Sequence, residues 1–254
     1  MYISLDEYED ALRYLEERDV GKNFYEKLRV IAGYYAEEKR LKPPAIRTKL
    51  NEYVCFCGES PSLNVWSDMI DAAIKNSSKR KLVRIEKIII TKGEMKKIGK
   101  LNGVLLKRLA FTLLCLAKYR DVVVDNNSHW VCYQDKEIMK LANIKLSLKR
   151  QAELYRTLKD LGYLHFPKKK NSISMQVMYI DNESEEEFCV TNFKDLGYQY
   201  LKHLGQPYFE CESCGAITKI KKSQSVAGRR PKYCESCAAL IRAKQNTESV
   251  MRLR

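Results

Sequence analysis

The sequence DKEIMKLANIKLSLKRQAELYRTLKDLG, residues 135–162, decides the fold of this chain. Asp135 can cap a short helix, and Asn143 interrupts the helical pattern after it. Ser147 opens a longer helix, and Gly162 ends it because glycine readily takes the left-handed conformation beyond a helix C-terminus. Two helices joined by a tight turn indicate a helix-turn-helix unit. The expected helices are residues 136–141 and 147–161.

Extended segments flank this pair of helices, and an almost wholly apolar helix precedes them. A helix, a short helix, a tight turn, a long helix and a hairpin with a basic tip follow one another in a winged helix-turn-helix domain, which we expect over residues 79–182. The other elements expected in it are a strand within 81–90, a turn at 91–93, a core helix over 101–120, extended segments at 122–124 and 129–133, and strands at 163–166 and 172–180.

Basic side chains occupy the positions where such a domain would contact nucleic acid. In winged helices the second helix of the pair enters the major groove, and the tip of the hairpin contacts phosphates. A small packing unit with a solvated lysine turn, or a domain that docks on proteins, is the alternative interpretation. The candidate residues are Lys145, Lys149, Arg150 and Arg156 on the helix and Lys168, Lys169 and Lys170 on the hairpin.

Four cysteines follow the spacing of a metal site. Cys211-Glu-Ser-Cys214 and Cys234-Glu-Ser-Cys237 are separated by the nineteen residues 215–233. Four thiolates complete the tetrahedral shell of one structural zinc ion, so we expect a zinc ribbon with a basic tail over residues 207–245. An iron–sulfur cluster, which also takes four cysteines, is the less favoured alternative. The loop between the pairs adds the candidate nucleic-acid residues Lys221, Lys222, Arg229 and Arg230.

The remaining segments are a helical unit and a linker. Residues 1–78 show several amphipathic helical stretches, and residues 1–19 carry seven acids against two bases. Residues 183–206 are expected to form a linker and a helix, because the acid-rich stretch 181–187 is typical of a solvated segment. The fold class expected for the whole chain is therefore mainly α with small β elements, an α+β fold.

The charge of the chain favours a polyanionic partner. Lys and Arg number 46 and Asp and Glu number 32, which gives a formal net charge of +14. A surplus of this size favours nucleic acid, with DNA preferred over RNA. A lysine-rich protein with no such partner is the simpler alternative.

The sequence also indicates a compartment. The longest apolar stretch, residues 109–117, is far shorter than the roughly 18–20 residues that span a bilayer. The first ten residues are acidic and lack an export segment, and nine cysteines are an odd number for a disulfide framework. We therefore expect a protein of a reducing cytoplasm with no membrane partner.

Catalytic motifs are weak. Gly93 and Gly99-Lys100 resemble a phosphate-binding loop, but five residues separate the glycines and no Ser or Thr follows the lysine. Glu94-Met-Lys96 has the acid-x-lysine spacing of some nucleases but lacks a preceding strand-borne aspartate. We therefore expect no enzymatic activity and assign no catalytic residue.

Four segments carry a resemblance to known proteins: residues 110–119, 135–144, 195–201 and 233–238. They resemble a group of uncharacterised proteins encoded in phages and prophages of Gram-positive, mostly clostridial, bacteria. The resemblance covers roughly residues 80–254. It implies a phage-borne protein in the cytoplasm of a bacterial host, and it implies no activity.

Two functions fit these features. The first is a nucleic-acid-binding protein of a phage or mobile element, acting in DNA replication or transcription control through the winged helix and the ribbon. The second is an inhibitor or adaptor that binds a host protein machine, such as a CRISPR effector or RNA polymerase. In the second case the acidic N-terminal unit would be the docking surface.

Overall fold

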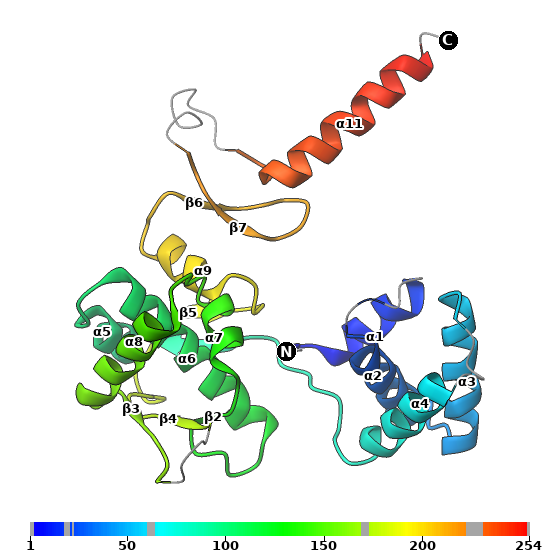
Figure 1. The fold of residues 1–254 in the computed structure, drawn as a ribbon, viewed down its shortest axis with the longest axis horizontal. Coiled ribbons are helices and arrows are strands. Elements are labelled where there is room, and N and C mark those ends of the chain that lie inside the picture. Colours follow the sequence, from blue (N-terminus) through cyan, green and yellow to red (C-terminus); the bar gives the residue numbers. More distant parts are fainter. Residues whose placement is uncertain are drawn as a thin grey trace. The chain divides into compact units, whose positions relative to one another are not determined.

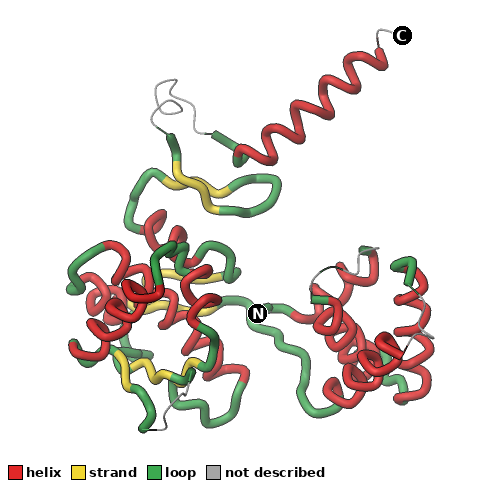
Figure 2. The backbone as a smooth tube through the Cα atoms, viewed as in Figure 1, coloured by secondary structure: helices red, strands yellow, loops and turns green. Residues whose placement is uncertain are grey.

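The computed structural model describes residues 3–17, 21, 23–59, 64–168, 173–221 and 231–252, with side chains described as far as residue 246. They are mainly helical with small antiparallel sheets, which confirms the expected α+β class (Figures 1 and 2). The chain divides into two compact units, Met1–Lys87 and Ile88–Arg254. Residues 79–87, expected in the central domain, therefore belong to the first unit.

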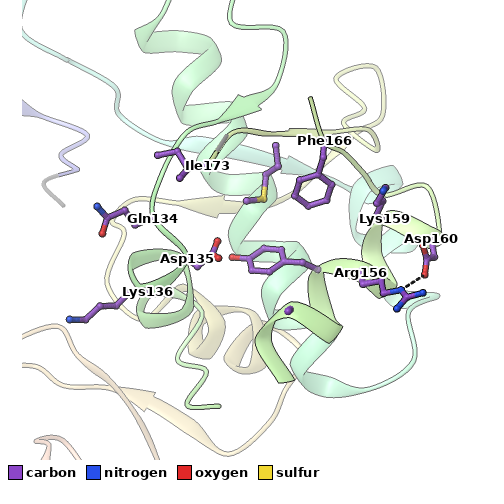
Figure 3. Close-up of a pocket in the computed structure, with 11 residues that line it drawn as sticks. Gln134, Asp135, Lys136, Arg156, Lys159, Asp160, Phe166 and Ile173 are labelled. Carbon is purple, nitrogen blue, oxygen red and sulfur yellow. Dashed lines mark ion pairs between the residues drawn. The ribbon is translucent and has the colours of Figure 1, made fainter. Parts of the chain in front are cut away.

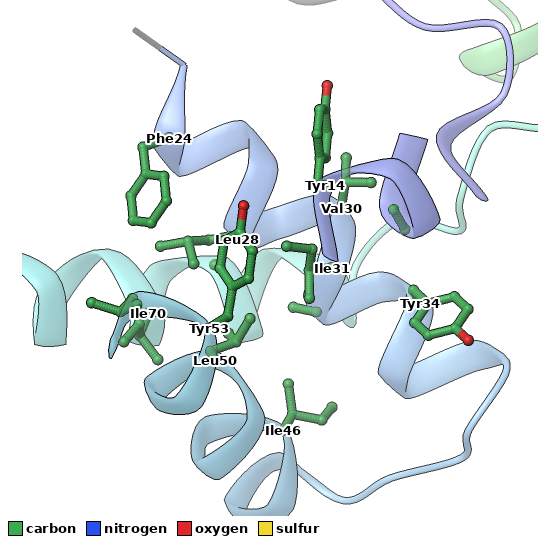
Figure 4. Packing of buried hydrophobic residues seen from close by; sticks show 14 of the residues in the cluster. Tyr14, Phe24, Leu28, Val30, Ile31, Tyr34, Ile46, Leu50, Tyr53 and Ile70 are labelled. Atoms are coloured by element: carbon green, nitrogen blue, oxygen red, sulfur yellow. The ribbon is translucent and has the colours of Figure 1, made fainter. Parts of the chain in front are cut away.

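The first unit is a set of helices around an apolar core (Figure 4). Leu28, Ile31, Leu50 and Ile70 are completely buried. Burying each such side chain contributes roughly 1.5–3 kcal/mol. The rings of Phe24 and Tyr53 stack with centroids 6.0 Å apart at the edge of this core. The helices are α1 (Glu7–Glu16), α2 (Phe24–Glu37), α3 (Pro43–Phe56) and α4 (Asn64–Ser77).

A buried carboxylate fastens the end of the first unit to its beginning. Glu7 is completely buried and accepts hydrogen bonds from Arg29 Nη2 at 2.6 Å and Arg80 Nη2 at 2.8 Å. It also accepts one from the backbone N–H of Val83 at 3.0 Å. The backbone N–H of Ile85 donates to the carbonyl of Leu5 at 2.7 Å. These bonds hold residues 79–87 to α1. This attachment explains why the segment belongs to the first unit and not to the second.

The second unit is built around α6 (Val104–Val123), whose central residues are almost all buried. Phe111 contacts Phe188 and Tyr200, with ring centroids 5.8 and 5.2 Å away. Gly103, with φ of 96°, turns the chain into the helix, because that conformation is open mainly to glycine. The expected strand at 122–124 is wrong, because α6 continues to Val123 with a helical hydrogen bond from the N–H of Val124 to the carbonyl of Arg120 at 2.8 Å.

Two strands that lie far apart in the sequence, one before and one after this core helix, pair in a small sheet. β1 (Ile88–Thr91) pairs antiparallel with β5 (Glu186–Val190), Ile88 opposite Val190. The expected solvated linker is thus wrong at its end, because Glu186 and Glu187 belong to a strand that satisfies the backbone of β1. The expected turn at 91–93 is instead the start of α5 (Lys92–Gly99), where Thr91 and Glu94 form a capping box.

The segment that decides the fold forms the elements expected of it. α7 (Asp135–Leu141) and α8 (Leu148–Asp160) confirm the expected pair of helices. β2 (Trp130–Val131), β3 (Leu164–His165) and β4 (Met175–Val177) form an antiparallel sheet in the order β2-β4-β3. Chain order in this part is therefore α6, β2, α7, α8, β3 and β4.

The last elements carry the cysteine quartet. α9 (Leu196–His203) packs on α6 and leads into the hairpin of β6 (Tyr208–Glu210) and β7 (Ile217–Lys219). α11 (Glu235–Arg252) begins at the second cysteine pair. We call residues 207–221 and 231–246 the C-terminal module.

Candidate metal centre and basic surface

The structure brings the four predicted metal ligands together. The Sγ atoms of Cys211, Cys214, Cys234 and Cys237 all lie within 4.8 Å of one another. The Sγ atoms of Cys214 and Cys234 are 3.8 Å apart. A tetrahedron of sulfur atoms at the usual Zn–S distance of about 2.3 Å has edges of about 3.8 Å. The quartet can therefore hold one metal ion, and four thiolates would leave it no open coordination position.

Backbone geometry forms the first cysteine pair into a tight knuckle. The N–H of Gly215 donates to the carbonyl of Cys211 at 2.8 Å. Gly215 has a φ of 68°, a conformation that favours glycine. The N–H of Cys234 donates to Sγ of Cys211 at 3.3 Å, and this bond makes the largest contribution among several hydrogen bonds that together lower the pKa of the Cys211 thiol to about 6. Hydrogen bonds of this kind favour the thiolate, which is the form that binds metal.

One aspartate attaches the C-terminal module to the helical core. Asp195 Oδ2 accepts from the backbone N–H of Ile217 at 3.2 Å, and its Oδ1 accepts from Asn143 Nδ2 at 2.6 Å. Lys194 Nζ donates to the carbonyl of Cys214 at 3.3 Å. Sequence reasoning did not find this role, because an aspartate before a helix is first interpreted as its cap, and Asp195 makes no side-chain cap bond to α9.

A buried arginine lies beside this attachment. Arg108 is 8% exposed, and its guanidinium donates to the carbonyls of Ala142 (Nε, 3.0 Å) and Asn143. Burial lowers the pKa of Arg108. These carbonyls end α7, where a positive charge is favourable. Arg108 therefore holds the end of α7 against α6, a role that only the tertiary structure reveals.

Gly197 allows this close packing, and its replacement is expected to be costly. A Cβ at this position would lie 2.0 Å from the carbonyl oxygen of Ala142 and 2.9 Å from Nε of Arg108. Gly197→Ala should therefore lower the free energy of unfolding of the second unit by about 3 kcal/mol, the upper range for overpacking, as measured by urea denaturation. Gly99→Ala is the control, because a Cβ there meets nothing within 4 Å. Equal stability of the two variants would contradict this account.

The predicted basic residues of α8 are exposed. Lys149, Arg150 and Arg156 are at the surface, while Tyr155 and Leu158 face the core. Lys145, expected on this helix, is also exposed but lies in the connection before it, because α8 begins only at Leu148. Arg156 Nε lies 3.7 Å from Asp160 Oδ2. Leu148 and Leu161, at the two ends of this helix, are exposed at 81% and 55%.

The other predicted basic residues are divided between described and undescribed parts of the chain. Lys168 is exposed after β3. Lys221 is exposed and forms an ion pair with Glu235. The remaining candidates, Lys169, Lys170, Lys222, Arg229 and Arg230, lie outside the described residues.

A groove of about 810 Å³ lies between the start of α7, α8 and the β3–β4 hairpin (Figure 3). Phe166 and Met175 line it from the hairpin side, and Lys136, Arg156 and Lys159 line it from the helices. Tyr155 also lines it, and burial, with the neighbouring Asp135 carboxylate, raises the pKa of its hydroxyl. The groove adjoins the basic residues of α8.

The weak catalytic motif has a structural role. Glu94 is completely buried and forms an ion pair with Lys118 Nζ at 2.7 Å. Its carboxylate also accepts from the N–H of Thr91 at 2.8 Å and of Asp181 at 3.0 Å. Lys96 is exposed and is not part of this group. Glu94 thus joins α5, α6 and the chain before β5.

Comparisons with known proteins identified no similar protein. No family model, no curated protein and no solved structure matches this chain. Among the described residues, none of the helices combines the length and the apolar character needed to cross a membrane.

Proposed function

We propose that this protein binds nucleic acid, DNA in preference to RNA, through a winged helix-turn-helix domain in its second unit. The observation that supports this most is the chain order α6, β2, α7, α8, β3, β4 with the sheet order β2-β4-β3. In a winged helix with this order, α8 would be the second helix of the pair and the β3–β4 hairpin would be the wing, which supports the proposal. A role in the replication or transcription control of a phage or mobile element is part of this proposal.

The side chains of α8 suit this role. Its buried positions, Tyr155 and Leu158, anchor one face. Lys149 and Arg150 are exposed in its first turn, the part that contacts base edges in helix-turn-helix proteins. Arg150 can then read guanine through two hydrogen bonds, while lysines such as Lys168 bind phosphates without regard to sequence.

We infer that the metal of the quartet is a structural zinc ion and that the C-terminal module is a zinc ribbon. Its all-cysteine ligand set and the S–S separation of 3.8 Å suit tetrahedral zinc. An iron–sulfur cluster is distinguished by its visible absorption and its iron content, both of which we expect to be absent.

The alternative function, docking on a host protein through the acidic N-terminal helix, receives less support. Glu7 is buried between Arg29 and Arg80. Glu17 lies 3.1 Å from Lys27 Nζ, and Asp10 pairs with Arg13. Much of the acidic charge of this helix is therefore compensated inside the first unit.

A charge-matched pair of variants tests DNA binding. Replacing Lys149 and Arg150 with glutamine should weaken binding to duplex DNA, because phosphate and base contacts are lost together. Each lost phosphate contact should flatten the slope of log affinity against log salt by about 0.9. Loss of Arg150 should cost about 1–3 kcal/mol at particular base pairs. Both are measured by fluorescence anisotropy across a salt series.

The control for this experiment replaces Lys96 and Lys100 with glutamine. Both are exposed on or beside α5 in the same unit, so net charge changes equally. We expect this control to retain nearly the affinity of the wild type. Equal affinity of both variants at every salt concentration would refute the assignment of α8, and no affinity of the wild type for free duplex would favour the protein-docking alternative.

A further inference from the structure

A second groove, of about 780 Å³, lies between α9 and the β6–β7 hairpin. Two tyrosines line it, Tyr198 from α9 and Tyr208 from β6. Lys219 and Lys221 line it from β7 and the residues after it, and Pro207 and Ile220 supply apolar surface. The groove thus combines aromatic rings with cationic side chains.

The two tyrosine rings pack against each other and form the aromatic surface of the groove, here called the tyrosine platform. Their centroids are 5.0 Å apart and their planes are tilted by 32°. The guanidinium of Arg108 lies 5.0 Å from the centroid of the Tyr198 ring, and Arg108 is itself held by the carbonyl of Ala142. Both rings remain half-buried, so part of each is accessible from the groove. A ring restrained in this way loses little conformational entropy when a ligand stacks on it.

The positive charge of the groove comes mainly from Lys219, since Lys221 also forms an ion pair with Glu235. Lys219 is exposed and forms no salt bridge with any residue in the described part of the chain. Glu210, on β6, is engaged by Lys202 Nζ at 2.9 Å. The groove therefore suits an anionic ligand with a flat aromatic part better than an acidic or a neutral apolar one.

We propose that this groove binds an unpaired nucleobase of a single-stranded nucleic acid. The base stacks on the tyrosine platform, and its neighbouring phosphates lie at Lys219 and Lys221. Stacking of this kind needs an exposed base face, which the interior of a duplex does not offer. The proposal rests on the proposed function and adds the form of nucleic acid that the C-terminal module recognises.

Variants at Tyr208 and Lys219 test the proposal. Binding of the full chain to a labelled oligothymidylate and to a duplex of equal length is measured by fluorescence anisotropy. Tyr208→Leu should weaken single-strand binding about tenfold or more, since stacking on an aromatic side chain typically contributes 1–3 kcal/mol per base. Tyr208→Phe, which keeps the ring, should bind nearly as tightly as the wild type. Lys219→Gln should weaken single-strand binding more than Lys100→Gln, which removes an equal charge elsewhere.

The outcomes separate this proposal from the proposed function. Affinity for the duplex should be unchanged in Tyr208→Leu and reduced in the variant that replaces Lys149 and Arg150 of α8 with glutamine. If Tyr208→Leu and Lys219→Gln both bind the single strand as tightly as the wild type, while duplex binding still depends on α8, the groove proposal alone is overturned. Equal weakening of both nucleic acids by Tyr208→Leu would also overturn it. A wild type that binds neither nucleic acid would overturn both proposals. Metal content is measured for each variant, because a variant that keeps its metal has a folded C-terminal module. If Tyr208→Leu loses its metal, the single-strand affinity of Lys219→Gln decides whether the groove proposal holds.

Discussion

Cys214→Ser is expected to unfold the C-terminal module and to leave the rest of the second unit folded. The buried cluster of this module consists of Cys211, Cys234 and Cys237, and its strands are only three residues long. So small a core cannot offset the conformational entropy of ordering the chain. Metal binding by such sites contributes about 10–16 kcal/mol, which is then the main source of folding free energy.

Hydrogen exchange followed by mass spectrometry measures this effect. The amides of β6 and β7 should lose protection in Cys214→Ser and in wild type treated with a chelator, while those of α6 keep theirs. Metal analysis should fall from about one zinc per chain, the count that a four-cysteine site requires, to none. Cys132→Ser is the matched control, since Cys132 is a half-buried thiol outside the quartet. A metal-free wild type with full protection of β6 and β7 would contradict the prediction.

Glu7→Ala is expected to destabilise the first unit by about 3–5 kcal/mol, the range for removing one partner of a buried ion pair. The side chain of Glu7 is 1% exposed and that of Arg29 is 11% exposed, so Arg29 would keep a buried positive charge with one carboxylate fewer. The N–H of Val83 would also lose its acceptor. Urea denaturation followed by circular dichroism measures the change in the free energy of unfolding.

Glu9→Ala provides the comparison for Glu7. Glu9 lies on the same helix, carries the same charge and is exposed, so its loss should change the stability by less than about 0.5 kcal/mol. Proteolytic cleavage within residues 79–87 should become faster in Glu7→Ala but not in Glu9→Ala, because the Glu7 carboxylate holds this segment to α1. Similar stability of the two variants would show that the ion pair contributes little.

Short-range patterns in the sequence predicted the parts of the fold that depend on neighbouring residues. The helix pair over 135–162 is marked by Asn143 and Gly162, each of which takes a positive φ in the structure. The cysteine quartet was found because two residues between thiols suffice to define a knuckle. These signals are complete within a few residues of chain, and tertiary contacts did not alter them.

Other features depend on contacts between distant residues and left no local signal. The acid-rich stretch before Phe188 suggests a solvated linker, yet its end pairs with β1. Arg108 looks like one base among many until the carbonyls of α7 are placed beside it. Leu148 and Leu161 follow the helical spacing of buried residues, yet both are exposed. The spacing of apolar residues predicts which face of a helix is buried. How much of that face is covered depends on the elements that pack against it.

The pairing of β1 with β5 also affects the order in which the protein can fold during synthesis. The contacts of the first unit all lie within its first 87 residues, so this unit can fold early. β1 cannot pair until residue 190 has left the ribosome, which at about 5–20 residues per second takes roughly 5–20 s after residue 88 appears. During this interval the edge of β1 and the side of α6 that packs against Phe188 and α9 have no native cover. Co-translational folding of the second unit is therefore a late, nearly single event, and its nascent chain is the form of this protein most exposed to aggregation and to chaperones.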